Sequence, residues 1–570
     1  MTFRFPWAGA LFGIAWLSAA AAAEPARPAP SGMSASQTSS PKQFKNADKI
    51  LHRLESAIKH NERNPQSDRE NQQFKAELAK LAERLARETQ AGAHNAAAEK
   101  AVQGLMRGDL RATADYLWQA EKAAESRAAN GAASRAEACA AARQLAAITV
   151  NGDVYTALAA MRRAVDYDAN DPGNWSLLGD MQAQAGDLPH AYSAYGKALA
   201  LLEEIAKSQP DDPERWRNLA SAHHKIGAFL SAQGDLPGAL ATYRKGLEIR
   251  QHLARLDLSN TGWQRELSYL QEKIGDIQSA QGDLAGALAS YRKGLEINEY
   301  LARQDPANSG WQRDLSVAYN KIGNIQRAQG DLSGALAVYR KDLAISGQLA
   351  RQNPANAGWQ RDLSVAYNKI GDTLSAQEDF PSALAAYRKG LEISERLTRQ
   401  DPENVGWQRD VGITHESIGD SLRDQGNLQG ALAAYRKGLE IRERLARQAP
   451  ANGGLQHDLR VAHERIGDIL RFQGDFSGAL LAYRKGLDTS ERLARQYPAN
   501  AGWQADVAVF CWKLSRLRGQ GVSDREAVAL LKRGAGLLER LAQEGRLNAD
   551  QKGWAQAFRG ELAKLESVRE

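Results

Sequence analysis

Two short stretches of the chain begin like the zinc-binding motif of metalloproteases. "HESIGD" starts at His415 and "HERIGD" starts at His463. In an HExxH motif, two histidines one helical turn apart bind zinc, and the glutamate acts as a general base. Gly419 and Gly467 stand where the second histidine is needed, so neither stretch can form this site. We expect both histidines to be solvated or packed against neighbouring residues rather than bound to a metal.

Other patterns that could carry chemistry are also incomplete. The sequence contains no GxxxxGK[ST], GxGxxG or GxSxG pattern, so the usual phosphate-binding loops and the serine-hydrolase elbow are absent. His223 and His224 form a lone pair, which is more typical of a surface than of a metal site. Cys139 and Cys511 belong to no CxxC motif, and we expect them to be buried and inert. The sequence therefore predicts no catalytic residue, no metal and no cofactor, and the chain is not expected to be an enzyme.

Length and charge narrow the class of protein further. The chain has 570 residues, of which 43% are hydrophobic and 25% are charged. Such a chain is too long for one compact core, which leaves several domains or a stacked array. Its 74 basic and 68 acidic residues give a net charge of +6 and are interleaved along the sequence. A nucleic-acid-binding protein more often gathers its basic residues into a patch, so no nucleic-acid partner is expected.

One sequence unit recurs at a step of 48 residues. The segment "GDLSGALAVYRK" opens at Gly330, and close copies open at Gly234, Gly282, Glu378, Gly426 and Gly474. The tyrosines of these copies keep the same step: Tyr243, Tyr291, Tyr339, Tyr387, Tyr435 and Tyr483. So do a set of preceding glycines: Gly227, Gly275, Gly323, Gly371, Gly419 and Gly467. A fixed period of this length indicates a solenoid of stacked repeats.

Each unit has the pattern of two helices. In the unit that begins at Trp311, the apolar residues Leu315, Ala318, Ile322 and Ile325 share one helical face. Gly330 suits the C-terminal end of this helix, and Asp331 suits the N-cap of the next one. The second helix is expected to stop before Asn353-Pro354, because the residue before proline disfavours helix.

The unit resembles the tetratricopeptide repeat family. Residues 172–206 carry the family's small, apolar and aromatic positions in order: Trp175, Leu178, Gly179, Gly186, Ala191, Tyr195 and Ala198. In the longer units, Gly323, Gly330, Ala335 and Tyr339 fall at the corresponding positions. The resemblance covers roughly residues 93–545 and implies an all-α fold, a right-handed superhelical solenoid of antiparallel helix hairpins. The family's unit has 34 residues, so a 48-residue unit implies arms about two turns longer.

The family also indicates a binding surface. Its first helices line a concave groove, and three positions of the motif usually face that groove. Carried over by register, these positions form what we call the first-helix stripe: Glu272, Asp276, Asn320, Asn324, Arg327, Asn368, Asp372, Glu416, Asp420, Arg423, Glu464, Asp468 and Arg471, with Ser279 and Ser375. Amides and carboxylates could hold the backbone of an extended peptide, and arginines could bind its carboxylates.

Two alternatives concern how these charges are used. Asp420–Arg423 and Asp468–Arg471 are three residues apart and could simply pair along their own helices. The recurrent "YRK" of the second helices is read as a solvated outer face with local glutamate partners. Its alternative is a basic ridge for an acidic polymer or a membrane surface.

The N-terminus has the pattern of a cleaved secretory signal. Arg4 precedes an apolar run from Trp7 to about Ala20, and small residues follow before Glu24. We divide the chain into a signal peptide (1–23), a flexible linker (24–44), an N-terminal helical segment (45–92), degenerate repeats (93–171), one repeat (172–211), six long repeats (212–501) and a degenerate repeat with a capping helix (502–570). Residues 45–92 are expected to cap the array, with self-association as the alternative.

These observations predict an exported, periplasmic scaffold without a transmembrane segment in its mature chain. The predicted partners are proteins of unknown identity, bound in the concave groove. One alternative is a non-catalytic regulatory subunit of an envelope enzyme or of a secretion or assembly complex. Another is a signal-anchored or cytoplasmic protein, such as a signalling adaptor, if the N-terminus is not a signal.

Overall fold

The computed structural model describes residues 50–51, 72–89, 95–107, 109–127, 131–150, 152–498, 500–547 and 551–567. The predicted signal peptide and linker lie outside these residues. The described residues belong to two compact units, one ending at Leu301 and the other beginning at Ala302. Helices make up both units, and the described residues contain no β-strand beyond one isolated bridge between Arg518 and Val522. The all-α prediction is confirmed.

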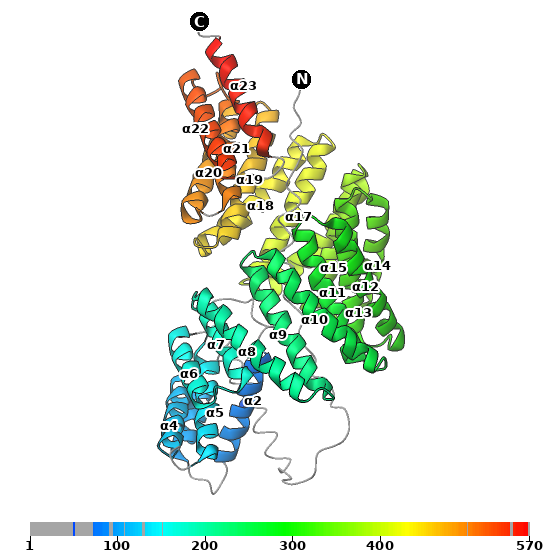
Figure 1. Cartoon of the computed structure of the whole chain (residues 1–570). Helices are drawn as coiled ribbons and strands as arrows, with labels where there is room; N and C mark the ends of the chain where they lie inside the picture. The colour runs from blue at the N-terminus through cyan, green and yellow to red at the C-terminus, as the bar shows by residue number, and fades with distance from the viewer. Residues whose placement is uncertain are drawn as a thin grey trace. The chain divides into compact units, whose positions relative to one another are not determined.

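The first unit runs through helices α2 to α11 and most of α12 (Figure 1). Their bounds are α2 Gln72–Glu88, α3 Ala96–Met106, α4 Arg111–Arg127, α5 Ala132–Thr149, α6 Val154–Tyr167, α7 Pro172–Gln184, α8 Leu188–Ser208, α9 Pro213–Ala232, α10 Leu236–Leu256, α11 Thr261–Ala280 and α12 Leu284–Gln304. Neighbouring helices pack in pairs, such as α7 with α8 and α9 with α10.

The second unit continues the same pairing. Its helices are α13 Ser309–Ala328, α14 Leu332–Gln352, α15 Ala357–Ala376, α16 Phe380–Gln400, α17 Val405–Asp424, α18 Leu428–Gln448, α19 Gly453–Phe472, α20 Phe476–Gln496, α21 Ala501–Ser515, α22 Asp524–Gln543 and α23 Trp554–Ser567. From α9 onward the first helix of each pair starts 48 residues after the previous one, and arms of 20 and 21 residues recur up to α20. The long hairpins predicted from the repeat are therefore present.

Each hairpin turn is built from the residues that the sequence pattern indicated. Gly330 has φ +83°, a left-handed conformation that a residue without Cβ adopts at little cost. Asp331 accepts a hydrogen bond from the backbone N–H of Gly334 at 2.9 Å and so caps α14. The copy that lacks glycine keeps the same geometry, because Glu378 has φ +63°. Glu378 is the single non-glycine residue with positive φ among the described residues.

Small residues let the two arms of a hairpin approach closely. A Cβ atom added to Gly323 would lie 2.6 Å from the Tyr339 ring, closer than packed atoms can be. The same glycine–tyrosine contact recurs in every long hairpin. On the second helix, a Cβ added to Gly390 would lie 3.1 Å from the carbonyl oxygen of Ser364. The glycine therefore lets α16 lie in close contact with α15. The equivalent residue of α14 is Asp342.

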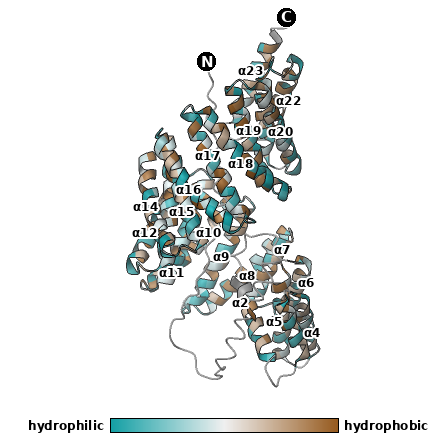
Figure 2. Ribbon diagram, turned by 180° about the vertical axis from the view of Figure 1, so that it is seen from behind, coloured by the Kyte–Doolittle hydropathy of each residue, from teal (hydrophilic) through white to brown (hydrophobic). Residues whose placement is uncertain are grey.

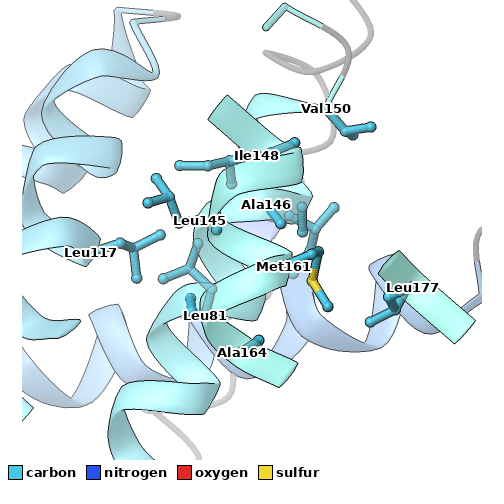
Figure 3. Packing of buried hydrophobic residues seen from close by; sticks show 14 of the residues in the cluster. Leu81, Leu117, Leu145, Ala146, Ile148, Val150, Met161, Ala164 and Leu177 are labelled. Atoms are coloured by element: carbon cyan, nitrogen blue, oxygen red, sulfur yellow. The ribbon is translucent and has the colours of Figure 1, made fainter. Parts of the chain in front are cut away.

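The N-terminal helices of the first unit share a larger core (Figure 3). Leu81 from α2 lies beside Leu117 from α4, Leu145 from α5 and Met161 from α6. The apolar side of α2, with Leu78 and Leu81, is therefore buried against its own chain. Of the helical segment predicted at residues 45–92, residues 45–49, 52–71 and 90–92 lie outside the described residues.

The C-terminal end is closed by a last helix. This helix, α23, begins at Trp554 after a short 3₁₀ turn. Phe558 of α23 packs against Gly534 of α22 and closes the apolar core of this end.

Along the chain, polar and apolar residues alternate around each helix (Figure 2). Within the described ranges, no helix is both long enough and apolar enough to cross a membrane.

Candidate binding site

The first-helix stripe lies on the first helix of consecutive hairpins. Its residues Glu272 and Asp276 belong to α11 of the first unit, and the rest belong to α13, α15, α17 and α19 of the second unit. With the exception of Ser279, which is buried, every residue of the stripe is half-buried. A half-buried polar side chain can bind a neighbour or meet a ligand, so the intramolecular partners of each residue determine which of these it does.

A tyrosine from the second helix donates a hydrogen bond to the stripe in each of these hairpins. The acceptors and donor–acceptor distances are Asp276 (2.7 Å), Asn324 (2.8 Å), Asp372 (2.9 Å), Asp420 (2.5 Å) and Asp468 (2.6 Å). Burial, followed by the charges of Asp276 and Glu272, raises the pKa of Tyr291, which therefore stays a neutral donor. In the first unit, Lys273 also lies 3.8 Å from Asp276.

The part of the stripe on α17 is closed by internal ion pairs. Glu416 accepts hydrogen bonds from Arg442 at 2.5 Å and from Arg465 at 2.9 Å. Burial alone would raise the pKa of Glu416, but the two arginines lower it to about 2. Asp420 binds Arg465 at 2.7 Å and Arg423 at 3.0 Å. The predicted pairing of Asp420 with Arg423 along one helix is therefore confirmed, and an additional cation comes from α19.

The part of the stripe on α19 is closed in the same way by α21. Lys513 of α21 lies 2.7 Å from Asp468 and 3.2 Å from Glu464. Burial opposes ionisation of Glu464, yet Lys513 and Arg460 lower its pKa to about 2. The Asp468 carboxylate binds Lys513 and the Tyr483 hydroxyl. Arg471 instead lies over the ring of Phe472, 4.8 Å from its centroid, so these contacts do not include the predicted Asp468–Arg471 pair.

The middle of the stripe is less completely paired. Asn368 donates a hydrogen bond to Thr414 at 2.9 Å, but its buried side-chain oxygen accepts none. Asn320 donates to the buried carboxylate of Asp342 at 3.1 Å. The Nε atom of Arg327 is buried and has no hydrogen-bond partner. The stripe residues of α13 and α15 therefore keep polar groups that the chain itself does not satisfy.

Comparison with known proteins identifies the repeat. A family model described as tetratricopeptide repeat matches residues 364–401 and 416–446, and a second model of the same description matches residues 270–300. These segments cover most of the hairpins α15–α16, α17–α18 and α11–α12. The chain contains tetratricopeptide repeats. Tetratricopeptide repeats imply a scaffold for protein–protein interaction.

Several solved structures resemble this tetratricopeptide-repeat protein at low identity. BtubC from P. vanneervenii is 19% identical, and the match covers 46% of this chain and 91% of BtubC with a TM-score of 0.35. The apo form of RapI is 12% identical, with 76% and 98% covered and a TM-score of 0.42. The C-terminal part of a TPR repeat-containing protein from Cytophaga hutchinsonii is 15% identical, with 52% and 98% covered and a TM-score of 0.33. No curated protein matches the chain in sequence.

The tetratricopeptide hairpins are also joined by ion pairs that the stripe prediction did not include. An arginine near the start of one first helix binds an aspartate of the next: Arg313–Asp362 (2.5 Å), Arg361–Asp410 (2.6 Å) and Arg409–Asp458 (2.5 Å). Both residues belong to the repeated "WQRD" or "LQHD" segment, at an offset of 49 residues. That offset of one repeat plus one residue is the sequence signal from which this series of ion pairs could have been predicted.

The histidines take structural positions. His415 and His463 are buried, and burial lowers the pKa of each to about 4. The prediction of a surface pair at His223 and His224 is wrong, because His223 is buried and His224 packs between Tyr243 and Tyr269. Among the described residues, no group of histidine, cysteine and acidic side chains is arranged to hold a metal ion. Both cysteines are buried and unpaired, as expected.

One cavity lies away from the stripe. It has a volume of about 640 Å³ and is lined by residues of α20, α21 and α22, including Arg495, Gln504 and Arg540. A smaller cavity of about 360 Å³ occupies the equivalent place one repeat earlier, beside Arg447 and Gln456. Both are spaces between the ends of long arms, and their repetition follows from the repeat itself.

Proposed function

We propose that this tetratricopeptide-repeat protein holds an extended segment of a partner polypeptide along the first-helix stripe of its second unit. The observation that supports the proposal most directly is the incomplete hydrogen bonding of polar side chains on α13 and α15. The side-chain oxygen of Asn368 has no N–H or O–H donor among the described residues, and an unpaired buried oxygen costs free energy. A peptide backbone offers such donors at regular intervals.

The internal ion pairs in the C-terminal part of the stripe favour a binding region that is shorter than the whole stripe. The carboxylates of Glu416 and Glu464 already have arginine or lysine partners from neighbouring helices. Breaking such buried ion pairs is costly, so a ligand gains little by competing for them. We therefore place the main contacts of the polypeptide on α13, α15 and the facing part of α17, rather than along the whole stripe.

Photocrosslinking in cells of the source organism tests this function. Benzoylphenylalanine is placed at Ser375 on the stripe face of α15 or at Arg388 on the exposed side of α16. A polypeptide crosslinked from position 375 and absent from position 388 is the expected result. Crosslinks from position 388 alone would move the interface to the basic second helices and contradict the proposal.

Export is part of the same proposal and has its own test. The N-terminal pattern of Arg4, an apolar run and small residues before Glu24 supports secretion across the inner membrane into the periplasm. Sequencing the N-terminus of the mature protein should give a start near Glu24. A mature chain that retains residues 1–23 would support the anchored or cytoplasmic alternative.

Self-association through residues 45–92 is tested by sedimentation of the chain with and without these residues.

A further inference from the structure

The Asp420 carboxylate is a point where several positive or donating groups converge. Its Oδ1 atom accepts hydrogen bonds from the Tyr435 hydroxyl at 2.5 Å, from Arg465 at 2.7 Å and from Arg423 at 3.0 Å. The three donors come from α18, α19 and α17 respectively. One carboxylate therefore joins two arginines and a tyrosine from three helices, and we call this arrangement the Asp420 cluster.

The same positions exist two repeats earlier with one decisive difference. Subtracting 96 residues from Asp420, Tyr435, Arg423 and Arg465 gives Asn324, Tyr339, Arg327 and Lys369. The tyrosine and both cations are kept, but an amide replaces the carboxylate. An amide has no negative charge, so it cannot balance the two cations.

The secondary acceptors of the Asp420 cluster are missing here as well. Asp424 lies 2.8 Å from one arginine of the cluster, and Glu416 accepts a hydrogen bond from the other at 2.9 Å. Their counterparts are Ala328 and Asn320. Each carboxylate that balances the cations around Asp420 is thus absent around Asn324.

Asn324 itself is fully engaged with other partners. Its side-chain oxygen accepts from Tyr339 at 2.8 Å, and its amide donates to Asn320 at 3.2 Å. Asn320 in turn donates to Asp342 at 3.1 Å. The amides therefore form a hydrogen-bonded chain directed towards the buried Asp342.

The two cations are left without the partners that their equivalents have. Arg327 has a buried Nε atom without a hydrogen bond, and Lys369 forms no ion pair within the described part of the chain. Burial lowers the pKa of Lys369, Arg327 lowers it further, and Asp372 and Asp342 oppose this change. Asp342 is 3% exposed and holds its own hydrogen bonds, while Asp372 accepts from Tyr387.

We propose that Arg327 and Lys369 bind the carboxylate of an acidic side chain of the partner polypeptide, which supplies the negative charge that Asp420 supplies to Arg423 and Arg465. This inference rests on the proposed function, since it assigns one contact of the bound polypeptide. A side-chain carboxylate on a short stem reproduces the chemistry that these cations meet elsewhere in the chain. Charge complementarity selects it, because the equivalent cations of the Asp420 cluster, Arg423 and Arg465, both pair with a carboxylate.

The probe is a blocked hexaglutamate peptide, with blocked hexaglutamine as the uncharged comparison. Hexaglutamine with a free C-terminal carboxylate serves as a third ligand. Binding to the full chain is followed by fluorescence anisotropy at two salt concentrations, because an exposed ion pair weakens with ionic strength. We expect hexaglutamate to bind more tightly at low salt and both glutamine peptides to bind at least tenfold more weakly.

The decisive variant is Asn324→Asp, which supplies the missing carboxylate from the chain itself. We expect it to raise the melting temperature and to weaken hexaglutamate binding about tenfold. Lys369→Gln should weaken binding similarly without raising the melting temperature. Asn353→Asp is the matched control: it makes the same change at the exposed end of α14, where Asp257, Asp305 and Asp401 stand in other repeats, and it should bind like the wild type.

Two results would overturn the inference. Equal binding of hexaglutamate to the wild type and to Asn324→Asp would show that Arg327 and Lys369 do not form the binding site. Tight binding of hexaglutamine with a free C-terminal carboxylate would show that the site binds a chain end instead of an acidic side chain. Crosslinking from position 375 distinguishes these failures from failure of the proposed function. If that crosslink persists, the polypeptide binds the stripe without this contact, and if it is absent as well, both proposals fail.

Discussion

The α13–α15 and α17–α19 segments of the second unit place the same side-chain positions in two different electrostatic states. Around Asp420, a carboxylate joins the tyrosine and two arginines. Around Asn324, the tyrosine contact is kept at 2.8 Å but the charge is lost. The hairpin backbone and the glycine–tyrosine contact are common to both segments, so the difference is one of side-chain chemistry alone.

This comparison shows how a repeat protein can vary its surface without varying its fold. The hairpin depends on small residues, caps and apolar faces, which the two segments share. The half-buried polar positions are free to change because they do not determine the helix packing. A segment whose charges are balanced internally is closed to charged ligands, whereas a segment with unbalanced cations is open to them.

The largest expected effect comes from converting the closed segment into the open one. Asp420→Asn removes the carboxylate shared by Arg423 and Arg465. Removing one partner of a buried ion pair costs about 3 kcal/mol or more, because the remaining charges stay buried without balance. Urea denaturation should show a loss of that size in the free energy of unfolding.

The neighbouring Asp424→Asn is the control for that variant. Its side chain is 45% exposed and lies 2.8 Å from Arg423, and such partly exposed pairs contribute about 1 kcal/mol or less. If both variants lost the same free energy, burial would not be what distinguishes the Asp420 cluster. Asp420→Asn should in addition gain binding of hexaglutamate if the open segment is correctly described.

The second effect concerns the buried carboxylate found only in the open segment. Burial raises the pKa of Asp342 to about 6 from an ordinary value of 3.8, against the lowering effect of hydrogen bonds from Ser316, Asn320 and Ser346. The folded chain therefore binds this proton more tightly than the unfolded chain does. The stabilisation is complete below about pH 3.8 and is lost as the pH rises through about 6.

Asp342→Asn tests this pH dependence. A shift of about two pKa units corresponds to roughly 3 kcal/mol. Relative to the wild type, the variant should therefore gain up to about 3 kcal/mol in unfolding free energy between pH 4 and pH 7. Asp342→Gly, which installs the residue of the other repeats, should show the same trend in chemical denaturation. Parallel stability curves for wild type and variants would mean that Asp342 does not titrate in this range.

Much of the fold could be predicted from the sequence because the repeat encodes it locally. Apolar residues at helical spacing, Gly330 at the turn and Asp331 at the cap each act within a few residues of their own position. Repetition then multiplies a weak local signal.

The candidate site was predicted only as a set of positions. The register placed Asp420 and Asn324 on the same face, but pairing between repeats depends on how successive helices are offset. Arg465 reaches Asp420 of the preceding repeat at a distance of 45 residues in sequence, not 48. Asp342 stands where the other long repeats have glycine, while its burial and its hydrogen bond from Asn320 depend on the packing of the helices.

The third effect is smaller and concerns the turn between α15 and α16. Glu378 has φ +63°, whereas glycine occupies this position in the other copies. A side chain in the left-handed region costs about 1–2 kcal/mol, and the flexibility of glycine in the unfolded chain offsets part of the gain. Glu378→Gly should therefore raise the unfolding free energy by about 1 kcal/mol, measured by thermal and urea unfolding. The reverse change Gly330→Glu should lower it by a similar amount, and a destabilised Glu378→Gly would indicate that the Glu378 side chain has another role.

The smallest effect is expected at an exposed ion pair between second helices. Arg484 and Glu526 are 3.1 Å apart, with side chains 53% and 39% exposed. Water already screens both charges, so a double-mutant cycle with alanine should give a coupling energy below about 0.5 kcal/mol that decreases further in high salt. The Arg409–Asp458 pair, whose aspartate is 12% exposed, should show the larger coupling of the two. Both pairs are within ion-pair distance, at 3.1 Å and 2.5 Å. A larger coupling energy for Arg484–Glu526 would therefore show that burial does not set the strength of these contacts, and the contrast between closed and open segments would then lose its physical basis.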